Sequence, residues 1–271
     1  MDLIKVGDIV NILLAINNNY INQTKVLLNS ILRSNQNELF NVYIMNKELT
    51  TLEKNDIINS VNSNIKIKFI TINNNKINKF PVYEKRYPVE IYFRLFASIY
   101  LPKSIDRILY LDVDTVVINS LKELYNMDFD NNLFIGATHI KEKLHKFNVL
   151  RFGVDDNYVY VNTGVLLMNL SLLRKINLED KIINFVNKNK SKLLLPDQDI
   201  IFALFGNRIK QIDSLKYNLG DKEINLHNLY NKNKIDINWV KNNSVIIHYY
   251  GRNKPWNKDY KGILDYFYNN S

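Results

Sequence analysis

The hydrophobic pattern of the first 72 residues alternates between short apolar runs and segments with other spacing. Residues 9–16 and 39–45 are mostly apolar runs of strand length, and residues 65–72 alternate between apolar and polar side chains as a strand does. Residues 21–33 carry apolar side chains at helical spacing, and residues 50–62 are a second predicted helix. Strands that alternate with helices predict a layered α/β domain with a mostly parallel sheet.

The remainder of the chain continues this alternation. A helix is predicted over residues 89–100, and Pro102 ends it. Further strands are predicted at residues 107–118, 133–140, 162–170 and 244–250, and further helices at residues 171–189 and 197–205. No internal repeat and no Pro/Gly-rich linker divides the chain, so a single domain is the simplest organisation.

Composition limits the class of protein. The chain has 271 residues, of which 46% are hydrophobic, and this is enough for an ordinary core. It has no cysteine, which excludes structural disulfides and thiolate metal sites. Met1-Asp2 does not begin a signal peptide, and no apolar run is long enough to span a bilayer. We therefore expect a cytoplasmic protein, which could also act at the inner face of the membrane.

The formal net charge of +9 suits an anionic partner, such as nucleic acid, a membrane surface or a phosphorylated substrate. The many Asn, Lys and Ile residues are also typical of an AT-rich genome, which explains part of this charge. Lysines dominate, they are scattered along the chain, and no nucleic-acid motif accompanies them. A basic nucleic-acid-binding protein is therefore the alternative to an enzyme.

Two carboxylates interrupt the apolar segment "RILYLDVDTVVI" at residues 107–118. Asp112 and Asp114 follow a predicted buried strand, and side chains two residues apart on extended backbone point to the same side. Ligands of open α/β sheets gather at the carboxyl ends of strands. The pair could hold a hard divalent cation, or it could be two exposed acids in a turn. The chain's other Asp-x-Asp pairs are at 128/130, in a polar turn, and at 197/199, near a helix start.

His248 is the candidate third ligand. It is one of four histidines and ends the predicted strand in "SVIIHYYG". Gly251 follows it, and then Arg252 and Lys254, in a short basic loop, where close backbone approach and a point charge suit a diphosphate. These features together predict a metal–diphosphate site.

Six motifs, in order along the chain, resemble glycosyltransferase family 8. The family includes the bacterial lipopolysaccharide galactosyl- and glucosyltransferases and, more distantly, the glycogenins. The matching segments are "AINNNY" (15–20), "YFRL" (92–95), "LYLDVDTVV" (109–117), "YVNTGVLLMNL" (160–170), "LPDQDI" (195–200) and "HYYGRNKPW" (248–256).

The resemblance implies a GT-A fold, in which helices cover both faces of a Rossmann-like, mostly parallel sheet. Residues 1–251 would form the catalytic domain, and the basic, aromatic tail 252–271 would complete the donor site. The implied reaction transfers glucose or galactose from a UDP-sugar to a hydroxyl of a glycan or glycoconjugate, with retention of configuration. The implied cofactor is Mn²⁺ or Mg²⁺. Asp112, Asp114 and His248 would bind this ion.

The resemblance also implies contacts to the donor. Tyr20 would stack on the uracil ring. The other donor contacts would come from Ala15, Ile16, Asn17, Asn19, Val113, Gly164, Gly251 and Lys254. The donor sugar would be surrounded by Arg94, Asn162, Asp197 and Gln198, the four expected catalytic residues. Without the resemblance, a structural ion pair is an equally good explanation of Arg94 in its apolar segment.

When the bond between the sugar and UDP breaks, positive charge develops on the sugar ring and negative charge on the departing diphosphate. The ion and Lys254 would stabilise the departing diphosphate, and Gln198 would lie beneath the anomeric carbon. Because an amide is a poor nucleophile, we expect front-face transfer, in which the leaving phosphate helps to deprotonate the acceptor hydroxyl.

Two departures from the family pattern bear on the substrates. Asn17 and Asn18 stand where relatives often carry an acid, although an Asn carbonyl can still accept a hydrogen bond from uracil. His139 and Ile140 stand where relatives often place an Asp near the sugar or acceptor, so the transferred sugar stays open. A non-catalytic relative that binds sugar nucleotides is a further alternative, and the tail could be a peripheral membrane anchor or a small packed helix.

Overall fold

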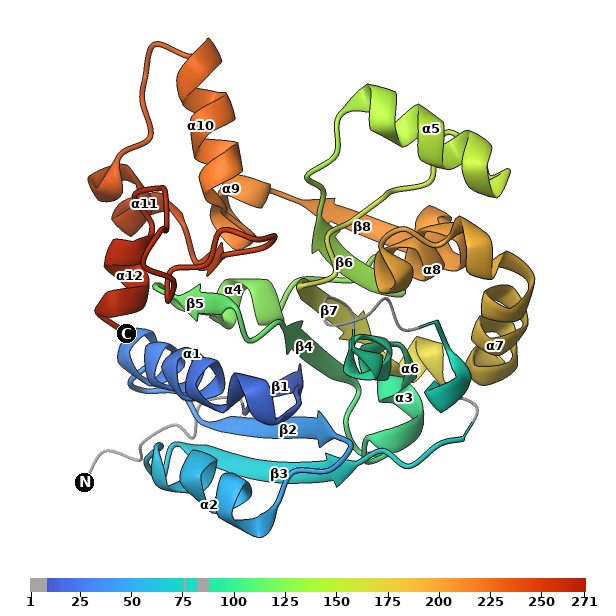
Figure 1. The fold of residues 1–271 in the computed structure, drawn as a ribbon, viewed down its shortest axis with the longest axis horizontal. Helices are drawn as coiled ribbons and strands as arrows, with labels where there is room; N and C mark the ends of the chain where they lie inside the picture. The colour runs from blue at the N-terminus through green and yellow to red at the C-terminus, as the bar shows by residue number, and fades with distance from the viewer. Residues whose placement is uncertain (1–8, 76, 82–87) are drawn as a thin grey trace.

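The computed structural model describes residues 9–75, 77–81 and 88–271. A seven-stranded sheet forms its centre, in the order β3-β2-β1-β4-β7-β6-β8 (Figure 1). The strands are β1 (Val10–Ala15), β2 (Phe40–Asn46), β3 (Ile65–Thr71), β4 (Arg107–Leu111), β6 (Phe134–Ala137), β7 (Val165–Asn169) and β8 (Ile209–Ile212). Only β7 runs antiparallel to its neighbours, and the other neighbouring pairs are parallel. The predicted mostly parallel sheet is confirmed.

The central strands are buried on both faces, which explains why β1 and β4 are mostly apolar, whereas the edge strands β3 and β8 carry lysines and other polar residues. In β1, Leu13 packs into one hydrophobic cluster, whereas Ile12 and Leu14 pack into the other. The first face is covered by η4 (Val89–Phe96), α3 (Ala97–Tyr100), α6 (Leu170–Leu173), α7 (Leu178–Asn189) and α8 (Pro196–Phe205). The second face is covered by α1 (Ile21–Ser34), α2 (Thr51–Asn59) and α4 (Lys122–Tyr125).

A second, two-stranded sheet corrects the prediction of one strand over residues 107–118. The chain leaves β4 at Leu111, turns at residues 112–114, and continues as β5 (Thr115–Val117). β5 pairs antiparallel with β9 (Ile246–His248) rather than with the central sheet. The turn closes through the Thr115 N–H, which donates to the Asp112 carbonyl at 3.2 Å. The two acids therefore lie where the chain passes from one sheet to the other.

Other predicted elements need smaller corrections. The predicted helix over residues 89–100 is a 3₁₀ segment, η4, followed by one α-turn. The predicted helix over residues 171–189 is two helices, α6 and α7, and the strand predicted from residue 162 begins only at Val165. Elements with too weak a pattern to be predicted are α5 (Glu142–Phe152), α9 (Ser214–Tyr217), α10 (Asp221–Tyr230), α11 (Ile237–Asn243) and β8.

The C-terminal tail packs as a small helix, α12 (Asp265–Asn269). Phe267 is buried in a third hydrophobic cluster with Val240 and Ile247, and Tyr268 packs against the same cluster. This arrangement favours the packed helix over an anchor. In the described part of the chain, every helix is too short or too polar to cross a bilayer. The remaining short elements are η1 (Asn18–Tyr20), η2 (Ile77–Lys79), η5 (Lys190–Lys192) and η6 (Gly206–Arg208).

Candidate active site

A cavity of about 950 Å³ opens at the carboxyl ends of β1 and β4. Because β7 runs antiparallel, the loop that leads into it, with Asn162 and Thr163, reaches the same edge of the sheet. The first turn of α8 contributes Asp197 and Gln198. The lining includes Ala15, Ile16, Asn17, Tyr20, Arg94, Asp112, Val113, Asp114, Asn162, Asp197, Gln198, His248, Gly251 and Lys254. Segments far apart in sequence therefore meet where α/β sheets usually bind ligands.

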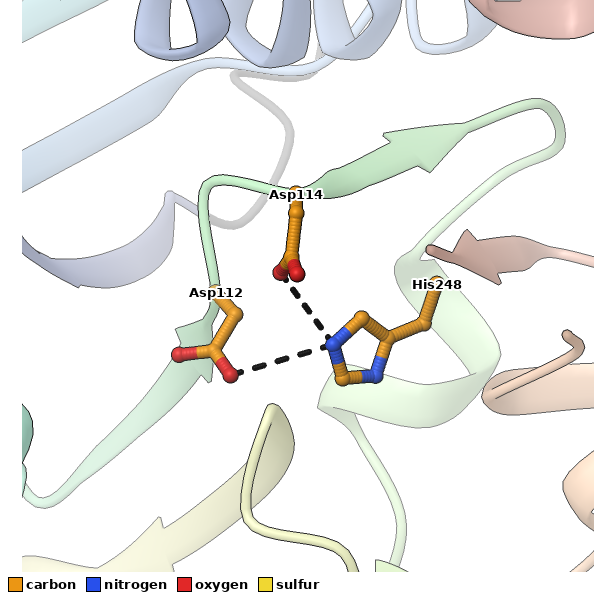
Figure 2. A group of neighbouring side chains, drawn as sticks. All are labelled: Asp112, Asp114 and His248. Atoms are coloured by element: carbon orange, nitrogen blue, oxygen red, sulfur yellow. Dashed lines mark ion pairs between the residues drawn. The ribbon is translucent and has the colours of Figure 1, made fainter. Parts of the chain in front are cut away.

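Three side chains in this cavity form a metal-ligand cluster (Figure 2). His248 Nε2 lies 3.2 Å from an oxygen of Asp114 and 3.8 Å from an oxygen of Asp112. All three ligand atoms lie within 4.8 Å of one another. The register of β5 and β9 explains this convergence, because His248 pairs with Thr115, the residue after Asp114. The predicted ligands are brought together by the structure.

The hydrogen-bond network around His248 leaves one ring nitrogen free for a metal. The Gly164 N–H donates to Asn162 Oδ1 at 3.0 Å, so this atom is an acceptor. Asn218 Nδ2 donates to the same oxygen at 3.2 Å, which turns Asn218 Oδ1 toward His248 Nδ1 at 2.9 Å. His248 Nδ1 must therefore carry a proton, and Nε2, which faces the two carboxylates, is the ring nitrogen left to bind a metal. This donor set of one imidazole and two carboxylates fits a divalent cation.

Gly164 lies directly behind the cluster and leaves no room for a side chain. A Cβ at this position would be 2.2 Å from His248 Cε1 and 2.7 Å from an oxygen of Asp112. We expect Gly164→Ala to displace the imidazole and to lower, about a hundredfold, the activity that the family resemblance implies, which is the effect of a misplacement of about 1 Å. The rate of UDP release checks this.

Gly153→Ala is the matched control for this substitution. Gly153 ends α5 at a φ of 65°, and nothing lies within 4 Å of its missing Cβ. The control should cost about 1 kcal/mol of stability and leave activity unchanged. Equal activity of the two variants would contradict the close approach at Gly164.

Cations hold the carboxylates of the cluster in place. Burial raises the pKa of Asp114, but Lys254 and His248 lower it more, so the pKa lies well below its ordinary value. Lys254 contacts Asp114 directly and donates to the Tyr249 carbonyl at 2.8 Å. Asp112 accepts from Tyr110 at 2.7 Å and from Arg94 at 2.8 Å.

Arg94 joins the metal cluster to the α8 end of the cavity. Its guanidinium, 5% exposed, lies 2.8 Å from Asp112 and 3.2 Å from Asp197, and it donates to the Thr163 carbonyl at 2.9 Å. Burial lowers the pKa of Arg94, but Asp112, Tyr110 and Asp197 raise it more, so the side chain stays charged. Arg94 is thus both an ion-pair residue and a residue of the cavity wall.

Asp197 and Gln198 are positioned by the start of α8. Asp197 accepts from the Thr163 hydroxyl at 2.6 Å, which fixes its carboxylate beside Arg94. Asp199, fully buried on the same turn, accepts from the backbone N–H groups of Leu194 and Leu195 at 2.6 and 3.0 Å. Asp199 is therefore a structural acid, and it holds the loop that presents its two neighbours to the cavity.

Two residues expected at the donor do not line the cavity. Gly164 is the close-packed residue behind the cluster. Asn19 is exposed, and its N–H donates to Asn17 Oδ1 at 3.1 Å in the short helix η1. Asn17 and Tyr20, at the two ends of η1, do line the cavity.

Several residues of the wall were not predicted from the sequence. They are Glu90, Tyr160, Thr163, Lys222, Glu223, Leu226 and Tyr250, and Asn218 and Tyr110 support the cluster from behind. Lys222, Glu223 and Leu226 belong to α10, whose sequence has no clear period. For Tyr250 the sequence did carry a signal, because it belongs to the pair of tyrosines that directly follows His248, and the structure has it in the cavity wall.

The comparisons with known proteins agree with this geometry. The profile of glycosyl transferase family 8 matches residues 11–260. A lipopolysaccharide 1,2-glucosyltransferase of Escherichia coli is 28% identical over 96% of this chain and 77% of its own length. The lipopolysaccharide glucosyltransferase WaaO of E. coli K12 is 28% identical over 70% of this chain and 56% of its own length.

A solved structure shows the same fold. The galactosyltransferase LgtC, in complex with donor and acceptor sugar analogues, superimposes with a TM-score of 0.84. The match is 21% identical and covers 96% of this chain and 94% of that one. The fold is accordingly of the GT-A type. Because the profile spans nearly the whole sequence, the chain belongs to glycosyltransferase family 8.

Proposed function

We propose that the protein is a metal-dependent, retaining hexosyltransferase, which moves glucose or galactose from a UDP-sugar to a hydroxyl of a glycan or glycoconjugate. One observation carries the proposal: Asp112, Asp114 and His248 converge within a large cavity at the sheet edge. Family membership favours this activity over nucleic-acid binding. The names of the E. coli relatives support an acceptor in lipopolysaccharide or a similar envelope glycan.

The three ligands would hold Mn²⁺ or Mg²⁺, which when bound supplies Lewis acidity to the leaving diphosphate. Lys254 contacts Asp114 in this structure and reaches the same corner of the cavity. We propose that its ammonium group turns to the diphosphate when the donor binds, because the ion then compensates Asp114. Gly251, at a φ of 87°, lets the backbone pass close to the phosphates.

The sugar would lie between the metal cluster and α8. Asp197 would accept hydrogen bonds from sugar hydroxyls, and Asn162 and Arg94 would hold the sugar from the β7 side. Gln198, half-buried in the cavity wall, would place its amide oxygen beneath the anomeric carbon and stabilise positive charge there. The leaving phosphate oxygen would take the acceptor's proton on the face that UDP leaves. A covalent adduct on Asp197 or Gln198, trapped and found by mass spectrometry, would contradict this front-face transfer.

Tyr20 tests the proposed nucleoside end of the cavity. We expect Tyr20→Ala to raise the KM for the UDP-sugar about tenfold or more, because a base stacked on an aromatic ring contributes about 1–3 kcal/mol. Tyr20→Phe keeps the ring and should keep the KM. Steady-state kinetics with varied donor measures both, and an unchanged KM in Tyr20→Ala would place uracil elsewhere.

A donor panel tests the activity itself. We expect Mn²⁺-dependent UDP release from UDP-glucose or UDP-galactose, and none from the GDP-sugars. Salt-sensitive binding to duplex DNA, measured by fluorescence anisotropy, is the signature of the nucleic-acid alternative. DNA binding without UDP release from any donor would reject the proposed function. Sugar-nucleotide binding without turnover would identify a non-catalytic relative.

A further inference from the structure

Among the described residues, three cations of the cavity wall form no ion pair with a carboxylate. Lys141 stands at the start of α5, Lys222 in the first turn of α10, and Arg252 after Gly251. Across the described ranges, none of the three takes part in an ion pair. The other cavity cations differ, since Arg94 and Lys254 are already paired with the acids of the metal cluster and α8.

Two helix ends add to this positive potential. Lys141 is the N-cap of α5 and Gly220 that of α10, and neither N-cap residue makes a side-chain cap hydrogen bond. Acids in the first turns, Glu142 in α5 and Asp221 and Glu223 in α10, offset part of the charge at each end. Figure 1 shows α5 and α10 standing out from the same side of the molecule, one on each side of the sheet edge. The N-terminal end of a helix carries partial positive charge. Lys141 and Lys222 therefore reinforce two such ends beside one cavity.

Little negative charge offsets these cations in their part of the wall. Glu223 lies beside Lys222, where its two oxygens are 2.6 and 2.7 Å from the Tyr250 hydroxyl, and its single negative charge offsets one of the three cations. His139 stacks on Tyr250 with ring centroids 4.8 Å apart, and burial lowers its pKa to about 4, which leaves it neutral. The wall formed by Lys141, Lys222 and Arg252, the cationic wall, thus carries a surplus of positive charge.

The proposed donor does not require the surplus positive charge of the cationic wall. The proposed UDP-sugar carries its negative charge on the diphosphate, which the metal ligands and Lys254 already serve. The hexose is uncharged. The cationic wall is therefore left for the second substrate, which must enter the same cavity for its hydroxyl to meet the sugar.

We propose that the cationic wall is an acceptor subsite, which selects acceptors that carry an oxyanion, phosphate or carboxylate, near the hydroxyl that receives the sugar. Leu226, in the same wall, supplies apolar contact for the face of the acceptor sugar, whereas the Tyr250 ring is already stacked on His139 and has Lys222 Nζ 5.2 Å from its centroid. This inference rests on the proposed function and adds the chemical class of the acceptor. Lys222 Nζ lies only 3.8 Å from the Cβ position of Gly251, so a donor role for this wall is the explanation to be excluded.

The test uses the protein saturated with UDP and Mn²⁺, so that the diphosphate site is filled. Calorimetric titrations with glucose, glucose 6-phosphate, glucuronic acid and inorganic phosphate then probe the remaining cavity. We expect at least one anionic sugar to bind about tenfold tighter than glucose, the effect of a charge-assisted hydrogen bond. The preference should shrink at high salt. Comparison of glucose 6-phosphate with glucuronic acid shows whether phosphate or carboxylate is favoured. Comparison of glucose 6-phosphate with inorganic phosphate shows whether the sugar contributes to the affinity.

The triple variant K141Q/K222Q/R252Q should lose the preference and keep its affinity for UDP within about twofold. The matched control, K103Q/K175Q/K188Q, removes the same charge from exposed lysines outside the cavity and should bind as the wild type does.

Three results overturn the inference: equal binding of charged and neutral sugars, no measurable binding of either anionic sugar, or loss of UDP affinity in the triple variant. Failure of the proposed function is distinct, because the wild type would then neither bind UDP with Mn²⁺ nor release it from a UDP-hexose.

Discussion

Asp114→Asn should lower kcat/KM for UDP release from the preferred UDP-hexose by about three orders of magnitude. Asparagine keeps the size of the side chain but removes its negative charge, which the proposed cation needs in a ligand. Lewis acidity contributes several kcal/mol, and each factor of ten in rate corresponds to about 1.4 kcal/mol. Lys254 would also lose its carboxylate partner. UDP release at saturating Mn²⁺ measures the effect.

The chain supplies a matched control for this substitution in its second Asp-x-Asp pair. Asp128 is exposed in a turn, where its Oδ1 accepts from the Asp130 N–H at 2.8 Å. Asp128→Asn keeps that acceptor and should release UDP at the wild-type rate. If both variants were equally active, Asp114 would not be a metal ligand and the proposed mechanism would be wrong.

Arg94→Met should destabilise the fold by about 3–5 kcal/mol, the cost of removing one partner of a buried ion pair, here the pair of Arg94 with Asp197, whose side chain is 9% exposed. Arg94 is 5% exposed and also pairs with Asp112, whose side chain is 28% exposed and adds less. Methionine preserves much of the apolar stem but none of the donors. Urea denaturation, followed by circular dichroism, gives the free energy of unfolding.

Lys25→Met is the control for removing a cation from an exposed ion pair. Lys25 and Asp56 lie 2.8 Å apart, with side chains 27% and 54% exposed. Exposed pairs contribute less than about 1 kcal/mol, so this variant should unfold almost as the wild type does. An Arg94→Met variant as stable as Lys25→Met would show that the cavity hydrates its acids well enough to dispense with the guanidinium.

The N-terminal half of the sheet could be predicted because its strands show either burial on both faces or clear alternation. Ile12, Leu13 and Leu14 of β1 are buried on both faces of the sheet, β3 alternates between apolar residues and lysines, and the helix α1 between β1 and β2 is amphipathic. The break of the predicted strand at Asp112 could not be predicted in the same way, because Thr115–Val117 is as apolar as the strand before it. Only the partner strand, Ile246–His248, determines that these residues belong to a second sheet.

The metal cluster could be predicted from residue types, but its surroundings could not. Asp112, Asp114 and His248 stand out as polar residues at the ends of apolar runs. Asn218 is one of many asparagines in the sequence, and its position behind His248 depends on long-range contacts. Lys222 lies on α10, a helix that projects from the body and has few buried residues, so the sequence carried no periodic signal for it.

Electron spin echo spectroscopy of Mn²⁺ bound with UDP tests the central claim most directly, because it detects nitrogen bonded to the ion. We predict that the wild-type complex shows ¹⁴N modulation from the His248 imidazole, and that His248→Gln abolishes this modulation. Manganese bound with UDP but without a nitrogen ligand in the wild type, or a ¹⁴N signal unchanged in His248→Gln, would contradict the proposed metal site.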